Sequence, residues 1–299
     1  ERDKIDAEYA ELLKKIEFCK AILASEKKVE AIIKEELENL RKKYGDDRRT
    51  DIVGEVEDLE IEDLIADEDV VVTVSHGGYI KRLPVSAYRK QKRGGKGATG
   101  AEVKEEDFME SLFVASTKDC LLVFTDKGQV HWLKVYEIPQ AGKLSKGKAI
   151  VNLVQMEQGS KVSSTIPVRE FVGDKYLVMI TKKGLIKKTR LDAYGNIRKG
   201  GIIGITLEDD DELKNVELTD GTQEVLIGTR QGKAIRFSES KVRDMGRSAK
   251  GVRGISLSKK DEVIDTVVLK KDSTILTVTT LGFVKRTTID EYRLTSRGG

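Results

Sequence analysis

A four-residue turn closed by glycine recurs five times between residues 70 and 299, and this repeat constrains the fold more than any other feature of the sequence. Each turn begins with Ser or Thr and follows a run of four mostly β-favouring residues. The runs with their turns read VVTV-SHGG, LLVF-TDKG, LVMI-TKKG, VLIG-TRQG and ILTV-TTLG. A glycine that closes such a turn adopts a positive φ, which is typical of a β-hairpin. The sequence therefore predicts five hairpins, with turn glycines at Gly78, Gly128, Gly184, Gly232 and Gly282.

The spacing of these turns predicts the architecture. Successive turn glycines are 50, 56, 48 and 50 residues apart. A further apolar run precedes most hairpins, such as ESLFVAS before LLVF and VIDTVVL before ILTV, so each unit supplies several short antiparallel strands. Units of this period, with about four strands each, are typical of propeller blades. We therefore predict a mainly β domain over residues 70–299, built as a propeller-like ring of about five blades.

Residues 1–45 have a helical pattern instead. Apolar residues recur at spacings of three and four from position 5 to 23 and again from 29 to 44, with a break at Ser25. Two interpretations stay open: a surface helix packed on its own domain, or half of a coiled coil or hairpin whose partner lies outside this chain. The second is favoured, because no neighbouring segment supplies an apolar face.

Residues 46–69 form the predicted linker. The stretch DIVGEVEDLEIEDLIADED, at 51–69, holds ten acidic residues and no basic one. We expect most of it to be solvated, with a short helix at Ile61–Ala66. The alternative is that it lies against the basic domain and competes electrostatically with a polyanion.

The net charge of +3 hides a strong asymmetry. Residues 1–69 carry 13 Lys or Arg and 23 Asp or Glu, a net charge of −10. Residues 70–299 carry the other 41 basic and 28 acidic residues, a net charge of +13. A basic domain of this kind predicts a polyanionic partner.

Composition excludes several other classes of function. Charged residues make up 35% of the chain and no apolar run is long enough to cross a membrane, so we expect no membrane partner. Cys19 and Cys120 lie far apart, and His76 and His131 are the two histidines in the sequence, so a zinc site is not expected. Lone cysteines favour a reducing, cytoplasmic setting. The first residue is Glu rather than Met, so we expect a fragment of a longer protein.

Basic residues recur at fixed offsets from the turn glycines. The fifteenth residue after the glycine is basic in all five units, and the fourth is basic in four, with Trp132 as the exception. Equivalent positions of successive blades face the same side of a ring, so these cations predict a basic rim that contacts phosphates. With neighbouring lysines, the expected rim consists of Lys81, Arg82, Lys143, Lys146, Lys187, Lys188, Lys199, Arg236, Arg247, Lys250, Lys285, Arg286 and Arg297.

The stretch QKRGGKG is the complete form of a motif that the other units carry in part. A Gly-Gly pair follows the fifteenth-position cation in the first, third and fifth units, and a Lys-Gly pair stands two residues further on in the first, second and fourth. A P-loop is excluded, because the lysine is followed by Gly rather than by Ser or Thr at a helix start. Cations are common on surfaces for solubility alone, but a random loop would not keep one at a fixed offset. Glycines also leave backbone N–H groups open to phosphate oxygens. The seven residues of this box are Gln91, Lys92, Arg93, Gly94, Gly95, Lys96 and Gly97.

Other candidate sites are weaker. We interpret His76 and His131 as structural residues. The acidic run at 207–213 lacks calcium-loop spacing and is interpreted as a solvated hairpin tip. Trp132 and Tyr136 are interpreted as core or inter-blade residues rather than as platforms for bases.

The box resembles the seven-residue sequence, usually Gln-Arg-Arg-Gly-Gly-Lys-Gly, that marks the C-terminal domains of DNA gyrase A subunits. Lys92 is the sole departure and keeps the charge. The stretches IEDLIADEDVVVTVSHGGYIKRLP and ERDKIDAEYAELLKKI are similar to the same family, so the resemblance covers essentially the whole chain. An intact box is specific, because the related topoisomerase IV subunits generally have it degraded or absent.

The resemblance implies a β-pinwheel, normally of six blades, whose basic outer rim bends and wraps double-stranded DNA. Residues 1–44 would be the returning arm of a coiled coil and the helix leading out of it. The box would contact DNA and help to join the first blade to the last. Five units are visible here, the fifth ending at Arg297-Gly298-Gly299, which leaves closure by a sixth blade open.

The resemblance also implies partners. The family acts in an A2B2 holoenzyme, with the gyrase B subunit and the N-terminal part of the gyrase A protein, in the bacterial cytoplasm at the nucleoid. That enzyme uses ATP and Mg²⁺ to introduce negative supercoils. Its catalytic tyrosine lies upstream of this region, so the chain alone is expected to cleave no DNA and to hold no cofactor.

The rival class is a β-propeller protein-interaction module without DNA binding. Propellers of the WD-repeat and kelch types carry Trp-Asp or paired-glycine-plus-aromatic signatures. This sequence contains neither signature, which favours the DNA-binding interpretation.

Overall fold

The computed structural model describes residues 1–50, 61–87, 107–196, 198 and 200–298. The chain divides into two compact units, Glu1–Asp58 and Leu59–Gly299. The second unit begins before residue 70, because the last residues of the predicted linker lie against the first blades.

The first unit is helical, as predicted. Helix α1 spans Arg2–Leu23 and helix α2 spans Glu26–Tyr44. The break falls at the predicted Ser25, which takes an extended conformation as the N-cap residue before α2. Neither helix buries a residue, so the apolar stripe of each is exposed.

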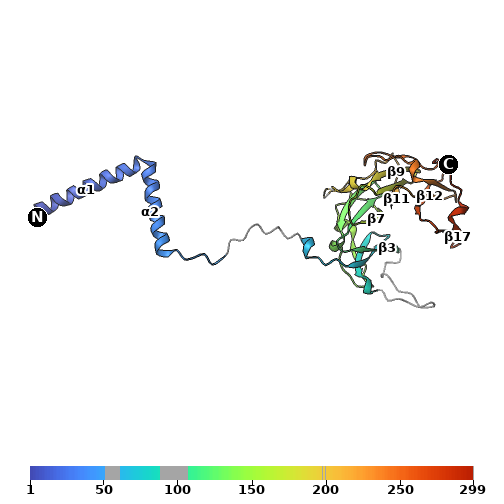
Figure 1. Cartoon of the computed structure of the whole chain (residues 1–299), viewed down its shortest axis with the longest axis horizontal. Helices are drawn as coiled ribbons and strands as arrows, with labels where there is room; N and C mark the ends of the chain where they lie inside the picture. The colour runs from blue at the N-terminus through green and yellow to red at the C-terminus, as the bar shows by residue number, and fades with distance from the viewer. Residues whose placement is uncertain (51–60, 88–106, 197, 199, 299) are drawn as a thin grey trace. The chain divides into compact units, whose positions relative to one another are not determined.

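The second unit contains the five predicted hairpins, and each turn glycine has a φ between 77° and 84°. In Figure 1 their strands follow one another round the unit in sequence order. The hairpin strands are β1 (Asp69–Ser75) and β2 (Tyr79–Pro84), β4 (Cys120–Thr125) and β5 (Gln129–Lys134), β8 (Tyr176–Thr181) and β9 (Leu185–Arg190), β12 (Glu224–Thr229) and β13 (Ala234–Ser238), and β16 (Thr274–Val278) and β17 (Val284–Thr288).

A longer strand follows each of the first four hairpins and pairs with that hairpin's first strand. These are β3 (Met109–Ser116), β7 (Val162–Val168), β11 (Leu213–Thr219) and β15 (Val263–Leu269). Short 3₁₀ helices connect the strands: η1 (Ile61–Leu64), η2 (Val85–Ala87), η3 (Val135–Glu137), η4 (Ile150–Asn152), η5 (Leu191–Tyr194), η6 (Glu239–Lys241) and η7 (Ile289–Glu291).

The units are joined by strand exchange. Three two-residue strands each follow the hairpin of their own unit and pair with the second hairpin strand of the unit before it: β6 (Lys148–Ala149) with β2, β10 (Ile202–Ile203) with β5, and β14 (Val252–Arg253) with β9. The resulting sheets have the orders β3-β1-β2-β6, β10-β5-β4-β7 and β11-β8-β9-β14. Each of these blades therefore contains three strands of its own unit and a fourth from the next.

The core lies between consecutive sheets, which explains the apolar runs of the repeat. On β4, Leu121 and Val123 pack towards the first blade, whereas Leu122 and Phe124 pack towards the third. Successive residues of a strand point to opposite faces, so a strand buried on both faces has no solvent-facing position. All six residues of β4 are accordingly buried.

The fifth hairpin differs from the others. Strands β16 and β17 pair with each other and, in the part of the chain that the structure describes, with no third strand. Large apolar residues such as Leu276 and Phe283 are exposed there. Leu294 nevertheless bridges to Arg236 on β13, as Gln140 does to Arg82 and Asp244 to Lys188, so the segment after this hairpin returns to the fourth unit.

Candidate nucleic-acid interface

The cations four residues after the turn glycines anchor the next unit. The Nε of Arg82 donates to the carbonyl oxygen of Ile138 at 2.6 Å, and its Nη2 donates to that of Tyr136 at 3.2 Å. In the fourth unit, Nη1 of Arg236 donates to the carbonyl oxygens of Ile289 and Tyr292 at 2.8 and 3.0 Å. These carbonyls lie at the 3₁₀ helices η3 and η7.

Lys188 makes the corresponding contact in the third unit. Its Nζ lies 3.1 Å from Oδ1 of Asp244 and 4.9 Å from the centre of the Tyr176 ring. Its side chain is 8% exposed. In the second unit, Trp132 takes this position and packs on Phe171, with ring centres 5.3 Å apart, which confirms its interpretation as an inter-blade residue.

Two of the expected rim lysines are buried more deeply. Lys81 is 1% exposed and Lys187 is fully buried. Lys81 donates to three backbone carbonyls of the second unit, and Lys187 donates to the carbonyls of Gly204 and Arg247. Burial lowers the pKa of both amines, that of Lys187 to about 7.

The prediction of an exposed rim is therefore wrong for part of the set. A duplex lying on the surface cannot reach a buried ammonium group. In the first, third and fourth units, cations at these offsets contact the next unit instead of sharing a solvent-facing edge. The residues that take this structural position are Lys81, Arg82, Lys187, Lys188 and Arg236.

The fifteenth-position cations lie on loops that these anchors hold. The carbonyl oxygens of Lys143 and Arg247 accept from the buried lysines, while both side chains are half-exposed. Arg297 donates to the carbonyl oxygens of Lys241 and Arg253 at 3.2 and 2.5 Å. Lys199 and the box Gln91–Gly97 fall outside the described residues.

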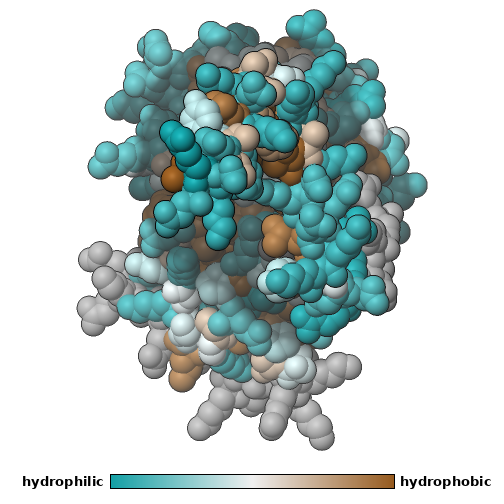
Figure 2. All heavy atoms as spheres, turned by 90° about the vertical axis from the view of Figure 1, so that its left-hand side faces the viewer, coloured by the Kyte–Doolittle hydropathy of each residue, from teal (hydrophilic) through white to brown (hydrophobic). Residues whose placement is uncertain are grey.

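Four expected rim residues are exposed: Lys146, Lys250, Lys285 and Arg286. Hydrophilic residues predominate on the face of the molecule shown in Figure 2. Lys146 and Lys250 are equivalent, since each stands directly before the glycine that leads into a crossing strand, β6 or β14. The Nζ of Lys250 lies 4.0 Å from Oε1 of Glu208, a distance that leaves this ion pair weak.

Sequence reasoning missed several exposed cations near these two. Lys148 lies on β6 and Arg253 on β14. Arg198 lines a cavity of about 820 Å³ together with Ser248 and with Arg247, which belongs to the expected rim. Lys148, Arg198 and Arg253 could have been found from the sequence, because each lies close to one of the recurring cations, although at no shared offset.

The glycines of the crossing loops are required by packing. Gly147 and Gly251 have φ values of 86° and 97°, and a Cβ on either would collide with a carbonyl oxygen of the preceding blade, that of Ile80 or Ile186. A Cβ on Gly201, with φ of 79°, would lie 2.6 Å from Cε1 of His131. The close approach of strands explains these three glycines without a phosphate contact.

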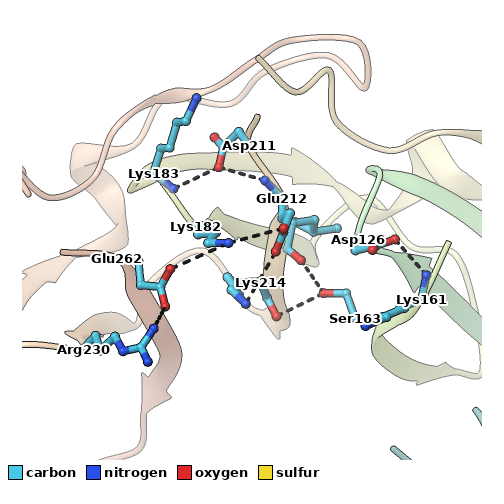
Figure 3. Close-up of polar contacts among 11 residues, drawn as sticks. Asp126, Lys161, Ser163, Lys182, Lys183, Asp211, Glu212, Lys214, Arg230 and Glu262 are labelled. Atoms are coloured by element: carbon cyan, nitrogen blue, oxygen red, sulfur yellow. Dashed lines mark hydrogen bonds and ion pairs between the residues drawn. The ribbon is translucent and has the colours of Figure 1, made fainter. Parts of the chain in front are cut away.

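A network of ion pairs fastens the hairpin turns to the neighbouring strands (Figure 3). The backbone N–H of Lys183 donates to Oδ1 of Asp211 at 2.9 Å, and Lys182 pairs with both Glu212 (3.3 Å) and Glu262 (3.7 Å). Arg230 pairs with Glu262 at 2.8 Å. The acidic run at 207–213 is therefore not a freely solvated tip, and Asp211 within it is 8% exposed.

The aspartate that caps the turn recurs, which the sequence analysis missed. Asp107 accepts from the N–H of Gly77 at 2.7 Å, and Asp261 accepts from the N–H of Gln231 at 3.0 Å. Asp107, Asp211 and Asp261 lie 29, 27 and 29 residues after their turn glycines. This nearly constant offset was the signal that could have identified them.

The remaining candidates carry no catalytic arrangement in the described part of the chain. His76 stacks on Phe108 with ring centres 4.7 Å apart. His131 is 1% exposed, and burial lowers its pKa, so the imidazole is neutral at pH 7. Among the described residues, no group of three or more His, Cys, Asp or Glu side chains could hold a metal ion. Within the same residues, no helix has the length and apolarity to span a membrane.

The end of the acidic segment docks on the first two blades. Glu62 lies 2.6 Å from Nζ of Lys134, and Asp67 lies 2.7 Å from Nη2 of Arg169. Hydrogen bonding from Ser116, followed by that from Arg169, lowers the pKa of Asp67. This part of the predicted linker therefore pairs with basic residues while most of its side chains stay exposed.

Comparison with known proteins places this arrangement in a family. The family model described as DNA gyrase C-terminal domain, β-propeller, matches residues 69–116, 121–169, 175–220, 223–270 and 273–299. The DNA gyrase A protein of Halalkalibacterium halodurans is 52% identical over 256 residues, which cover 86% of this chain and 31% of that protein. The DNA gyrase A protein of Staphylococcus aureus is 46% identical over 303 residues, which cover 100% of this chain and 34% of that protein. The chain spans about a third of the length of these relatives.

Solved structures agree with the fold. The C-terminal domain of a DNA topoisomerase IV is similar with a TM-score of 0.65 and 32% identity, over 78% of this chain and 72% of that one. A DNA gyrase A C-terminal domain is similar with a TM-score of 0.65 and 25% identity, over 77% of this chain and 75% of that one. The five segments matched by the family model coincide with the five hairpin units. The chain therefore belongs to the family of DNA gyrase C-terminal domains with the β-propeller fold.

Proposed function

We propose that the β unit binds double-stranded DNA along its crossing loops and bends it. The observation that carries this proposal is the equivalent placement of Lys146 and Lys250, exposed at the same point of two different units. Lys148 and Arg253, on the strands that follow, add exposed cations beside them. Cations repeated along a curved surface contact successive phosphates without reading the base sequence.

The relatives support a proposal about the larger activity. We propose that the chain is the wrapping region of a gyrase A protein, which acts with its own N-terminal part and with the gyrase B subunit in an A2B2 enzyme. DNA held as a crossing of fixed hand lets the enzyme introduce negative supercoils with ATP and Mg²⁺, which belong to the holoenzyme. Its setting would be the bacterial cytoplasm, at the nucleoid.

The salt dependence of DNA affinity tests this function. Each phosphate contact contributes a slope of about −0.9 to log K against log salt, so several contacts give roughly −4 or steeper. We expect such a slope in fluorescence anisotropy with short duplexes, and similar affinities for unrelated sequences. A shallow slope or strong preference for one sequence would count against binding through crossing-loop cations. Failure to bind at low salt would favour the rival protein-interaction module.

The variant Lys146→Ala with Lys250→Ala should make the slope less steep by about 2, one unit for each phosphate that is no longer neutralised. Lys127→Ala is a matched control, because Lys127 is an exposed lysine at a hairpin turn that pairs with Glu157 at 3.3 Å. This control should leave the slope unchanged.

A further inference from the structure

Lys81 holds a loop of the next unit from inside. Its Nζ donates to the carbonyl oxygens of Gly142 at 3.2 Å, Lys143 at 2.7 Å and Ser145 at 2.7 Å. Three acceptors require three N–H donors, and of the two forms of the amine only the charged ammonium has three. The loop 142–147 therefore wraps round a buried positive charge.

Lys187 occupies the equivalent position two units later, three residues after its turn glycine. Its Nζ donates to the carbonyl oxygen of Gly204 at 2.5 Å and to that of Arg247. Tyr194 donates its hydroxyl to the same Gly204 oxygen at 3.1 Å. Two acceptors are satisfied by either form of the amine, so this contact holds whether or not the group is charged.

Each of these loops carries an exposed lysine as well. Lys146 stands on loop 142–147, and Lys250 stands on loop 246–251. The backbone of one short loop is thus fixed by a buried lysine of the preceding blade, while its own lysine faces solvent. This connects the two kinds of cation in the repeat.

The second unit has His131 at the offset that the buried lysines occupy elsewhere. Neither ring nitrogen of His131 has a hydrogen-bond partner in the described part of the chain. A neutral imidazole has a single N–H donor, so it cannot replace an ammonium that satisfies two or three carbonyls. The contact at Lys81 and Lys187 is therefore a feature of particular units and not a general requirement of the fold.

We propose that Lys81 and Lys187 are positioning residues, a role that rests on the proposed DNA binding. Lys81 fixes the loop that carries Lys146, and Lys187 fixes the loop that carries Lys250. Each exposed lysine is then already ordered when it meets a phosphate. Neither buried lysine touches the duplex. A loop that must first be ordered loses affinity, because immobilising each flexible side chain costs free energy on binding. Removing either buried lysine should weaken DNA binding roughly two- to tenfold.

A double-mutant cycle separates this role from a general effect on the fold. DNA affinity is measured by anisotropy with the full 299-residue chain at fixed salt. We expect Lys187→Met to weaken binding in the otherwise intact chain, and to have little further effect when Arg247 and Lys250 are both alanine. Lys183→Met removes a charge from the exposed turn of the same hairpin and should act additively with those alanines. Additive behaviour of Lys187→Met would overturn the proposal.

Hydrogen exchange gives a readout that does not depend on DNA. In Lys187→Met, the amides of loop 246–251 should exchange faster while those of β8 and β9 keep their protection. Lys81→Met should do the same to loop 142–147. If the intact chain binds no DNA but the loops loosen, the proposed function fails and the loop-fixing role stands. Unchanged hydrogen exchange of the loops in both variants would refute the loop-fixing role. So would a failure to fold in each of the two single variants.

Discussion

The ammonium nitrogen of Lys81 lies 2.7 Å from the carbonyl oxygen of Lys143, a residue 62 positions later in the chain. Lys81 is buried where the first unit meets the second, and Lys143 lies half-exposed on a loop. The basic residues of the repeat therefore divide into two groups, one that joins the units and one that faces solvent. The predictions below follow from that division.

Arg236 belongs to the first group. Its Nε lies 2.6 Å from Oε2 of Glu224, and its side chain is 14% exposed. Arg236→Ala removes the donor to that carboxylate and to the carbonyl oxygens of Ile289 and Tyr292, so we expect a loss of about 2–4 kcal/mol in the free energy of unfolding. Urea denaturation measures this loss. DNA affinity, corrected for the folded fraction, should change by less than in Lys250→Ala.

Arg230→Ala is the control for this variant. Arg230 also pairs with a carboxylate, at 2.8 Å, but its side chain is 71% exposed. Exposed ion pairs contribute about 0–1 kcal/mol. Equal losses in the two variants would contradict an anchoring role for Arg236.

Gly147 tests the packing explanation for the crossing-loop glycines. Gly147→Ala places a Cβ against the carbonyl oxygen of Ile80 at a φ of 86°, so the loop must shift. We expect a loss of roughly 2 kcal/mol or more in the free energy of unfolding. Gly142→Ala, in the same loop, has open space within 4 Å and no positive φ, and should change it by less than about 0.5 kcal/mol. A comparable loss in Gly142→Ala would refute the explanation.

The titration of Lys187 should appear in the pH dependence of stability. Burial first, and the Arg247 cation second, lower its pKa from 10.5 to about 7. Between these values the unfolded chain binds a proton that the folded chain does not, so the free energy of unfolding rises with pH in this window. We expect the urea midpoint to rise from pH 7 to pH 10, and Lys187→Met to lose part of that rise. An identical rise in both proteins would show that Lys187 titrates normally.

The acidic segment should compete with DNA. Residues 51–66 hold seven carboxylates, and Glu62 among them pairs with Lys134 at 2.6 Å. Deleting these residues should tighten DNA binding at low salt, with a gain that shrinks as added salt screens the charges. Anisotropy titrations at two salt concentrations measure this difference. Unchanged affinity would leave the segment as a plain linker.

The periodic features of the fold could be predicted from the sequence. The five hairpins follow from glycines that need a positive φ, and the helix break at Ser25 follows from the interrupted apolar stripe. Strand exchange could not be predicted, because a two-residue strand such as β6 has no periodicity of its own. Its partner, β2, belongs to the preceding unit, so the pairing is set by tertiary packing.

The candidate site shows the same limit. Charge and offset identify Lys146 and Lys187 equally well, yet one is exposed and the other fully buried. A lysine is buried where backbone carbonyls converge on its Nζ, and those carbonyls come from another unit. A cation that recurs in the repeat therefore indicates a selected position. The recurrence does not indicate whether the residue packs between units or binds a ligand.

Bending of DNA is the central claim, and energy transfer across an end-labelled duplex tests it most directly. Bending a short duplex costs on the order of several kcal/mol, so contacts must be spread along the arc. We predict that saturating protein raises the transfer efficiency. Lys92, Arg93 and Lys96 changed together to Ala should keep appreciable affinity but lose much of that rise, and the holoenzyme should then relax DNA with ATP without supercoiling it. Saturated binding with no rise in transfer would contradict bending, and full transfer with the triple variant would assign the box to closure of the ring.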